Sequence, residues 1–337
     1  AAAECGQLET VQWLRGQQPP CPWGVKVISG AASNGHMDVV QWLRGCQPPC
    51  PWGFDTTELA ARGGHIQLLQ WLQEQTPAWP LDAGTLASAA AGGQLETVQW
   101  LRAQQPPCPW DATACWMAAY KGNVQMLQCL RGLDPPCPWD ETATNAAGDA
   151  GNLEMLKLLR ALDPPCPWDA RLCLRACQSR HWDVLRWLRM QEPPCPCDAK
   201  VCYYLAYYGE RELLCWLRSQ HPPAPWDVSS CKVAAQLGNL QTLQCLRGMY
   251  PPCPWDETVT TAAAGNLEML KVLRAFEPPC PWDESVLRCA AAGRQVEAVR
   301  WLMSQEPPCP CDKMVCYHLA RLGECELLRW LRARHPP

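Results

Sequence analysis

Short stretches with a helical spacing of apolar residues alternate along this chain with stretches rich in proline. In one of them, Val124, Met126, Leu127 and Leu130 place apolar side chains on one face of a helix. A first helix is expected just before it, running to about Tyr120. The apolar pattern therefore predicts pairs of short helices separated by non-helical loops.

Polar and special residues at the expected helix ends agree with this pattern. Asp111 can accept hydrogen bonds from the free amides of the first helix, and Asn123 can do the same for the second. Gly122 suits the left-handed residue that ends a helix. Pro135 and Pro136 exclude helical conformation, so the second helix must end before them and a stiff loop must return the chain to Asp140.

The helix pair and its loop recur along the whole chain. Successive copies are 29 residues apart, with one step of 27. The cysteine of the proline-rich loop, or the residue in its place, falls at Cys21, Cys50, Trp79, Cys108, Cys137, Cys166, Cys195, Ala224, Cys253, Cys280 and Cys309. The repeats start near residues 24, 53, 82, 111, 140, 169, 198, 227, 256, 283 and 312, and residues 1–23 form a partial repeat.

This periodicity predicts an all-α fold, an elongated solenoid of eleven to twelve stacked helix-turn-helix repeats in one domain over residues 1–337. One short helix pair cannot bury its apolar face alone, so neighbouring repeats must stack. The repeat at Asp256 is two residues shorter before Gly265, which predicts a shorter first helix or a tighter turn. The chain opens at Ala1 inside a first helix and stops at Pro337, where another loop would follow, so the array is expected to continue beyond both ends.

The repeat resembles the ankyrin repeat. Thr113, the pair Ala118 and Ala119, and the turn Gly122 with Asn123 match the family pattern T-P-L-H-x-A-A-x-x-G-H. The resemblance covers the whole chain and is closest to short ankyrin-like units built on a CPWDE core, as at residues 137–141. The period is shorter than the family's, and the T-P-L-H start is replaced, so a projecting β-hairpin is not expected. The resemblance implies that the first helices line a concave binding groove.

The residues on the implied groove vary strongly from repeat to repeat. Tyrosine gives a large contact area with few rotatable bonds, which suits a protein-binding hot spot. The alternative is that these rings only pack against neighbouring repeats. The candidate partner-binding residues are Trp116, Tyr120, Lys121, Tyr203, Tyr204, Tyr207, Tyr208, Tyr317, His318 and Arg321.

Composition narrows the function classes. The formal net charge is −4, with both signs interleaved, so no nucleic-acid partner is expected. No apolar run is long enough to insert into a membrane. Equivalent cysteines of stacked repeats should lie about 8–10 Å apart, beyond disulfide reach. The 24 cysteines are therefore expected to be buried free thiols in an intracellular, reducing compartment, the cytoplasm being expected and an organelle staying open.

Two columns of side chains recur in the second helices, each with a structural and a binding interpretation. An apolar position is expected to pack between repeats, with a stacking ladder as the alternative; it is tryptophan at Trp13, Trp42, Trp71, Trp100, Trp187, Trp216, Trp301 and Trp330. Two residues later an arginine is expected to pair with nearby acids or helix carbonyls, with an acidic partner as the alternative. The arginines are Arg15, Arg44, Arg102, Arg131, Arg160, Arg189, Arg218, Arg247, Arg274 and Arg332.

Metal and catalytic chemistry find little support in the sequence. Two clusters of three cysteines could begin a zinc site, but neither has an evident fourth ligand; they are Cys195, Cys197 and Cys202, and Cys309, Cys311 and Cys316. The turn histidines His36, His65 and His181 have a backbone hydrogen-bonding role in the ankyrin family. No nucleophile, base and orienting acid can be assembled, so neither an enzyme nor a cofactor is expected.

These observations favour a protein-protein interaction scaffold that binds its partner through the first-helix face. One alternative is a structural subunit or spacer of a larger assembly, contacting it by its loops or outer helices. Another is a cysteine-based metal or redox-responsive protein.

Overall fold

The computed structural model describes residues 1–53, 55–75 and 79–334, with side chains as far as residue 331. Within these ranges the chain forms 23 α-helices and no strand. The predicted all-α repeat fold is therefore confirmed. None of the described helices combines the length and the apolar character that crossing a bilayer requires. The last member of the arginine column, Arg332, and the chain end at Pro336 and Pro337 lie beyond the residues whose side chains the structure describes.

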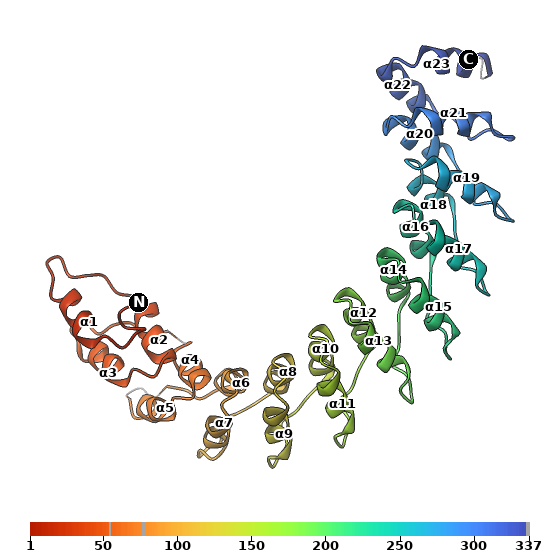
Figure 1. Ribbon diagram of the computed structural model, residues 1–337. Helices are drawn as coiled ribbons and strands as arrows, with labels where there is room; N and C mark the ends of the chain where they lie inside the picture. The colour runs from red at the N-terminus through yellow and green to blue at the C-terminus, as the bar shows by residue number, and fades with distance from the viewer. Residues whose placement is uncertain (54, 76–78, 335–337) are drawn as a thin grey trace. The chain divides into compact units, whose positions relative to one another are not determined.

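Each repeat contributes a first and a second helix, and the two kinds form separate rows within each compact part of the chain (Figure 1). The first helices are α2 (Val25–Ser33), α4 (Asp55–Gly63), α6 (Ala83–Gly92), α8 (Ala112–Tyr120), α10 (Glu141–Asp149), α12 (Ala170–Gln178), α14 (Ala199–Tyr208), α16 (Val228–Gln236), α18 (Glu257–Ala262), α20 (Glu284–Ala292) and α22 (Lys313–Leu322). The second helices are α1 (Leu8–Arg15), α3 (Met37–Gly45), α5 (Ile66–Gln73), α7 (Leu95–Arg102), α9 (Val124–Gly132), α11 (Leu153–Ala161), α13 (Trp182–Arg189), α15 (Arg211–Ser219), α17 (Leu240–Gly248), α19 (Leu267–Ala275), α21 (Val296–Ser304) and α23 (Cys325–Arg334).

Contacts divide the chain into two compact units, and the border falls inside α13. Unit 1 is Ala1–Val184 and unit 2 is Leu185–Pro337. In unit 1 the first helices pack in sequence from α2 to α12, and in unit 2 from α14 to α22. The single continuous domain stays a prediction from the sequence, and each unit is described by itself.

Small side chains allow the first helices of a unit to pack closely. The pair Ala118 and Ala119 of α8 is fully buried, as are Ala234 and Ala235 of α16. Leucines of the second helices, such as Leu127 and Leu130, complete the core of each repeat. Burial of a leucine side chain stabilises a fold by about 1.5–3 kcal/mol, so stacked repeats gain the stability that one helix pair lacks.

The predicted caps are present in the repeat that starts at Asp111. The Asp111 carboxylate accepts a hydrogen bond from the Thr113 amide at 2.9 Å, and Asn123 accepts one from the Met126 amide at 2.9 Å. Gly122 has φ +68°, in the left-handed region that favours glycine. The helix ends therefore follow from local sequence.

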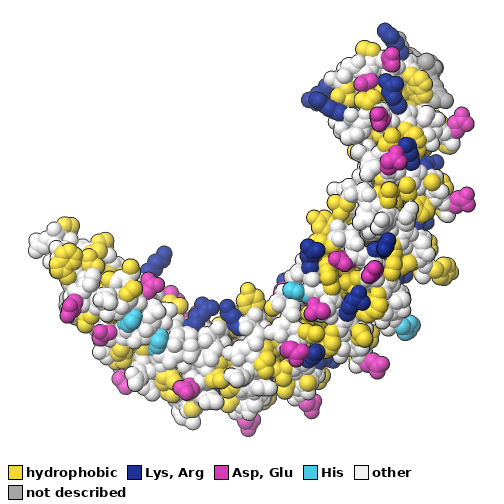
Figure 2. All heavy atoms as spheres, viewed as in Figure 1, with side chains coloured by type: hydrophobic (Ala, Val, Ile, Leu, Met, Phe, Trp, Pro, Cys, Tyr) yellow, Lys and Arg dark blue, Asp and Glu magenta, His cyan; other side chains and the backbone are white. Residues whose placement is uncertain are grey.

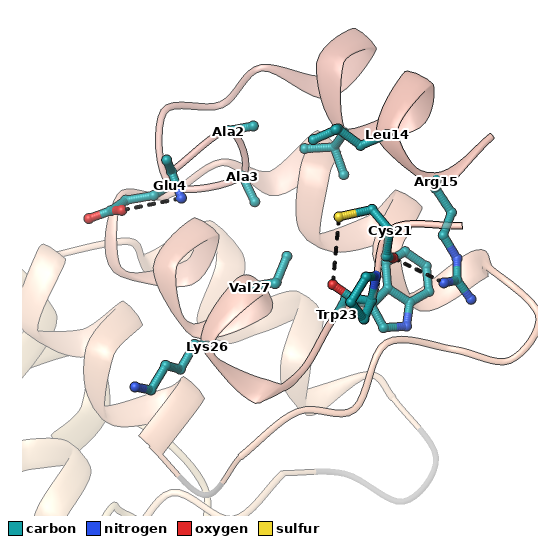
Figure 3. Close-up of a pocket in the computed structure, with 12 residues that line it drawn as sticks. Ala2, Ala3, Glu4, Leu14, Arg15, Cys21, Trp23, Lys26 and Val27 are labelled. Atoms are coloured by element: carbon teal, nitrogen blue, oxygen red, sulfur yellow. Dashed lines mark hydrogen bonds and ion pairs between the residues drawn. The ribbon is translucent and has the colours of Figure 1, made fainter. Parts of the chain in front are cut away.

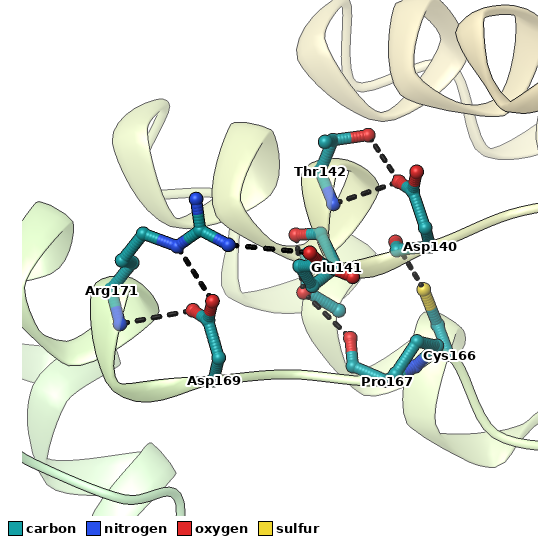
Figure 4. A network of polar contacts seen from close by, with 8 residues as sticks. Asp140, Glu141, Thr142, Cys166, Pro167, Asp169 and Arg171 are labelled. Atoms are coloured by element: carbon teal, nitrogen blue, oxygen red, sulfur yellow. Dashed lines mark hydrogen bonds and ion pairs between the residues drawn. The ribbon is translucent and has the colours of Figure 1, made fainter.

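In the repeat that starts at Asp140, a second set of polar contacts ties the loop back to the start of the repeat (Figure 4). The Cys166 thiol donates to the backbone carbonyl of Asp140 at 3.2 Å, and the Thr144 hydroxyl donates to the carbonyl of Pro167 at 2.9 Å. The Asp140 carboxylate meanwhile caps α10 through the Thr142 amide at 2.9 Å. One aspartate thus caps a helix through its side chain and anchors the loop through its backbone.

The two-residue deletion shortens a helix, as the sequence predicts. Helix α18 has six residues, whereas the other first helices have nine or ten. A hollow of about 430 Å³ lies beside it, lined by α16, α18 and α20 side chains such as Lys232, Thr261 and Ser285.

Candidate binding face

The first helix of the repeat at Asp198 presents the densest group of candidate residues. Asp198 caps α14 through the Lys200 amide at 3.1 Å, and Gly209 ends the helix with φ +76°. Leu205 and Ala206 lie on the buried face. The tyrosines at the other helical positions are consequently left on the side away from the core.

The four tyrosines of α14 form one continuous aromatic cluster. Tyr203 and Tyr207, one helical turn apart, stack with ring centroids 6.4 Å apart, and Tyr204 and Tyr208 stack at 6.2 Å. Edge contacts at 5.3 Å and 5.1 Å join the two stacks. Tyr207 is 46% exposed, and the other three rings are half-buried. We call these four residues the tyrosine cluster.

Three further candidates lie together on α8 and its C-cap, in unit 1. Trp116 and Tyr120 stack with ring centroids 5.8 Å apart, and the Lys121 ammonium lies 5.5 Å from the Tyr120 ring centre. Tyr120 is 51% exposed. This group is smaller than the tyrosine cluster, but it has the same arrangement of rings one turn apart on a first helix.

The last three candidates lie on α22, in unit 2. Tyr317 is exposed, and its ring meets the edge of the His318 ring at 5.4 Å. His318 and Arg321 line a hollow of about 230 Å³ between α20 and α22. Lysine and arginine side chains gather on the first-helix side of this part of unit 2 (Figure 2).

Arg294, which lines the same hollow, was not predicted from the sequence. It stands where most repeats have the left-handed turn glycine, and it keeps that conformation with φ +61°. A bulky side chain at such a position is uncommon. The replacement of the turn glycine by arginine is the feature of the sequence that could have identified Arg294 as a candidate. The hollow thus carries two arginines and a histidine, a setting that suits a carboxylate or another anion.

The arginine column has a different partner from the two expected ones. In the described part of the chain, nine of these arginines donate through Nη1 to the backbone carbonyl of the loop residue six positions later, at 2.5–3.3 Å. In eight of these repeats the guanidinium also covers the ring of the loop tryptophan, with Cζ 3.8–4.0 Å from the ring centre. The expectation of acid or helix-carbonyl partners was wrong, because the loop folds back under the helix end and supplies its own carbonyl.

This arrangement is visible in the first repeat (Figure 3). The Arg15 guanidinium donates to the Cys21 carbonyl at 3.3 Å and lies over the Trp23 ring at 3.9 Å. Val27 and Leu14 line the apolar hollow of about 240 Å³ beside it. We call the arginine, the loop carbonyl and the loop tryptophan the loop clamp. The clamp uses the arginine structurally and leaves it little freedom to hold a partner.

The tryptophan column packs against the loop of the preceding repeat. Trp42 meets the ring of Trp23 edge-on at 6.1 Å, and Trp301 meets Trp282 in the same way at 6.4 Å. Because loop and helix tryptophans belong to neighbouring repeats, the observed contacts agree with the expected packing between repeats.

The turn histidines connect neighbouring repeats through the backbone. Nε2 of His36, His65 and His181 donates to the carbonyl of Glu4, Ser33 and Asp149 in the repeat before, at 3.0–3.1 Å. This is the backbone role that the ankyrin resemblance implied.

All 24 cysteines are free thiols, and 13 of them are buried. Burial raises the pKa of Cys108, Cys166, Cys202, Cys280 and Cys309 to about 12. These thiols stay neutral at physiological pH and act as small apolar groups.

Cysteines at non-equivalent positions of one repeat come into contact. The Cys115 thiol donates to the backbone carbonyl of Cys137 at 4.0 Å, and the Cys231 thiol donates to that of Cys253 at 4.0 Å. The expectation about disulfide reach concerned equivalent cysteines of stacked repeats and stays a prediction. The two cysteines of each pair here stand at non-equivalent positions, and they meet because the loop returns to the first helix of its own repeat.

Two thiols of the second cysteine cluster donate to different backbone carbonyls. Cys309 donates to the Asp283 carbonyl at 3.4 Å, whereas Cys311 donates to the Asp312 carbonyl at 3.5 Å. Throughout the described part of the chain, no three histidine, cysteine or acidic side chains come together in a way that could hold a metal ion.

Comparisons with known proteins give likeness of fold only. No protein-family model matches the chain, and neither does any curated protein sequence. Among solved structures, the chain is similar to the pentatricopeptide repeat protein PPR10 in complex with an 18-nucleotide psaJ RNA element, and to a triple cysteine-to-serine variant of PPR10 with the same RNA. In both cases the identity is 12%, the TM-score is 0.49, and the match covers 97% of this chain and 56% of that chain.

The helices of the chain themselves show a helical repeat, and the comparisons do not single out the ankyrin type. They also correct the exclusion of nucleic acid, which was wrong. The solved structures that this chain is similar to are helical-repeat proteins in complex with RNA. The exclusion rested on a net charge averaged over the whole chain, and such an average says nothing of one face, such as the one bearing Arg294 and Arg321.

Proposed function

We propose that this chain is a binding scaffold that recognises a protein partner through the first-helix face of unit 2. The observation that carries the proposal is the tyrosine cluster: four rings in mutual contact on one helix, on the side away from the core, with Tyr207 46% exposed. Rigid clustered tyrosines give much contact area for little loss of side-chain freedom.

The charges of the same face suggest the chemistry of the partner. The hollow between α20 and α22 is lined by Arg294, Arg321 and His318, and within the described residues neither arginine forms an ion pair. A partner segment with an aromatic or aliphatic anchor and acidic residues would complement both features. We propose such a segment as the occupant.

The scaffold is further proposed to be non-catalytic and built of short ankyrin-like repeats. The turn glycines with positive φ and the histidine bonds between repeats support the ankyrin type. The raised pKa of the buried thiols suits a reducing compartment, where the thiols stay unmodified.

The test compares three purified forms of the chain in quantitative crosslinking pull-downs from native extract: wild type, Tyr203→Ala with Tyr207→Ala, and Tyr250→Ala. Tyr250 is 97% exposed and lies in a loop, so it controls for loss of an exposed tyrosine elsewhere. A protein partner should be lost with the double variant and retained with Tyr250→Ala. Circular dichroism would check that all three keep their helices.

Two outcomes would overturn the proposal. Capture of the same partners by the double variant would remove the tyrosine cluster from the interface and favour contact by loops or outer helices. Capture abolished by ribonuclease treatment in every form would point to an RNA partner, and fluorescence anisotropy with single-stranded RNA would then measure that binding directly.

A further inference from the structure

The first helices of unit 2 carry three distinct features along their row. Helices α14, α16, α18, α20 and α22 contact one another in that order. The tyrosine cluster lies on α14, a hollow of about 430 Å³ lies beside α18, and a hollow of about 230 Å³ lies between α20 and α22. The row therefore has an aromatic end, a middle and a basic end.

Equivalent repeat positions place the three features on the same side of the helices. Tyr203, Lys232 and Thr261 each stand five residues after the aspartate that caps their helix, and the last two line the hollow beside α18. Tyr207 and Arg321 each stand nine residues after the cap of their helix. Because equivalent positions of stacked repeats face the same way, one partner segment can contact all three features.

The end of this face at α14 is apolar beyond the tyrosine cluster itself. Leu237 stands ten residues after the cap of α16, as Tyr208 does after the cap of α14, and it is 51% exposed. The exposed leucine extends the apolar part of the face by one repeat. This end therefore suits an aromatic or aliphatic anchor of a partner.

The middle of the face is polar, and its charges are unpaired. We call the hollow beside α18, which Lys232, Gln236 and Glu257 line together with Thr258 and Ser285, the α18 hollow. Within the described part of the chain, neither Lys232 nor Glu257 forms an ion pair. The ammonium, amide and carboxylate offer both donors and acceptors. An extended peptide segment has free backbone N–H and C=O groups that match this set, whereas a helix has already paired its own.

The end of the face at α22 is basic. We call the hollow lined by Arg294, His318 and Arg321 the arginine hollow. Both arginines are exposed, and the carboxylate of Asp312, which caps α22, is already paired with Arg288 at 3.0 Å. The two exposed guanidinium groups can therefore bind carboxylates of a partner.

We propose that this face binds an extended segment of a protein partner, with an apolar anchor on the tyrosine cluster and carboxylates in the arginine hollow. The inference rests on the proposed function and adds the conformation of the bound segment and the spacing of its contacts. Packed helices lie about 8–10 Å apart, so the three to four helix steps from α14 to the arginine hollow span about 24–40 Å. An extended chain covers that distance in about 7–12 residues, whereas a helix would need about 16–27.

Selection from a random peptide library tests this spacing. Phage that display random peptides of about 30 residues, long enough for either conformation, are selected on the purified full-length chain. Peptides that still bind the Tyr203→Ala with Tyr207→Ala variant are then removed. We expect the remaining peptides to share acidic residues about 7–12 positions from an aromatic or aliphatic residue.

Affinities of the enriched peptides test the arginine hollow. Fluorescein-labelled synthetic copies are measured by anisotropy, and Arg321→Ala should weaken their binding about tenfold by removing a charged hydrogen bond. Arg300→Ala is the control, because it removes a 54% exposed arginine from the second helix α21, and it should change affinity less than about twofold. Once the acidic residues of a peptide are replaced by amides, Arg321→Ala should have no further effect.

An insertion tests the α18 hollow. The repeat that contains α10 has Gly148 and Asp149 where the repeat of α18 is two residues shorter. Inserting Gly-Asn between Ala263 and Ala264 restores this length without adding a charge, and should lengthen α18 and fill the hollow. We expect affinity for the peptides to fall about tenfold, because hydrogen bonds to the extended segment are lost. Circular dichroism would check that the helices are kept.

Three results would overturn this inference and leave the proposed function standing. The first is a set of tyrosine-dependent peptides that lack the acidic residues or are indifferent to Arg321→Ala. The second is an acidic spacing of about 16 residues or more, which would show a helical segment. The third is an insertion in α18 that leaves the affinity unchanged.

A different result would count against the proposed function as well. A library that yields no tyrosine-dependent peptide would show that this face does not bind a peptide segment. Binding of single-stranded RNA that Arg321→Ala weakens and Arg300→Ala does not would then assign the face to RNA.

Discussion

The loop clamp assigns each repeated arginine to the stability of its own repeat. Its guanidinium makes one charge-assisted hydrogen bond to a backbone carbonyl and lies over one aromatic face. Both interactions are strong for their kind, because the charged donor is shielded from water by the tryptophan ring.

We therefore expect Arg247→Ala to destabilise unit 2 by about 2–4 kcal/mol, because the substitution removes a charged hydrogen bond and a cation–π interaction together. Urea unfolding would measure the change. Arg300→Ala is the control, since the Arg300 side chain is 54% exposed and its ion pair with Glu326 is 3.8 Å long. That control should shift stability by less than about 0.5 kcal/mol. Equal effects of the two variants would contradict a structural role for the clamp.

The buried thiols make the free energy of unfolding depend on pH. Their folded pKa of about 12 lies above the usual value of about 8.5 in an unfolded chain. Below a pH of about 8.5 both states keep the proton and the thiols contribute fully. Above it the unfolded state loses protons that the folded state keeps, so stability falls as pH rises toward 12.

Each such thiol should lower the free energy of unfolding by about 1.4 kcal/mol per pH unit in that window. Urea midpoints at several pH values under reducing conditions would measure the slope. In Cys108→Ala the slope should decrease by one thiol, and Ala224 shows that the repeat accepts alanine at this loop position. An unchanged slope would show that Cys108 ionises as freely in the folded state as in the unfolded one.

At the scale of the helix, the sequence predicted the elements well because each end carries its own signal. Aspartate and asparagine caps, left-handed glycines and proline pairs act within a few residues, so α8 and α9 end where the pattern places them. What the sequence did not predict depends on how elements meet. The carbonyl that binds Arg131 becomes a partner only when the loop has folded back under the helix end.

In the repeat with the shortened helix α18, the turn glycine is conserved in position but does not have the backbone conformation of the other turn glycines. Gly265 occupies the turn position of its repeat, but its backbone is not left-handed and an added Cβ would meet open space. Gly238, one repeat earlier, has φ +72°, and an added Cβ would lie 2.9 Å from Nδ2 of Asn266. The deletion has therefore released one glycine from its usual constraint.

Alanine substitution should affect stability differently at these two glycines. Gly238→Ala is expected to destabilise unit 2 by about 1 kcal/mol or more, whereas Gly265→Ala should be neutral or stabilise it by up to about 1 kcal/mol. Thermal unfolding of the two variants side by side would measure this difference. A large destabilisation by Gly265→Ala would show that its turn is as constrained as the others.

At the scale of the whole molecule, we expect each of the two compact units to unfold as a cooperative body. Repeat arrays are stabilised by contacts between neighbours, and cooperativity weakens over long arrays. A division of contacts inside α13 therefore predicts that the units unfold separately.

Calorimetry should show two transitions, and variants should assign them. Arg131→Ala, in unit 1, should lower one midpoint, and Arg247→Ala, in unit 2, should lower the other. A single transition shifted by both variants would mean that the chain unfolds as one cooperative body.

The binding candidates were predicted less completely than the fold, and for a physical reason. Variation between repeats pointed to the tyrosines on α14, since a helical spacing places them on one face. Arg294 was not identified because it lies in a turn, where a helical spacing cannot place a residue on a face. Its proximity to His318 and Arg321 arises from the stacking of α20 and α22.

The buried loop cysteines have a practical consequence for following motion in this chain. Eight of the eleven loops carry a thiol that is shielded from reagents while its repeat is closed and is uncovered when that repeat opens. Alkylation followed by peptide mapping would time those openings at Cys50, Cys108, Cys137, Cys166, Cys195, Cys253, Cys280 and Cys309. The wild-type sequence thus contains eight native thiols, each in a different loop, whose alkylation rates report the local opening of their repeats without any introduced label.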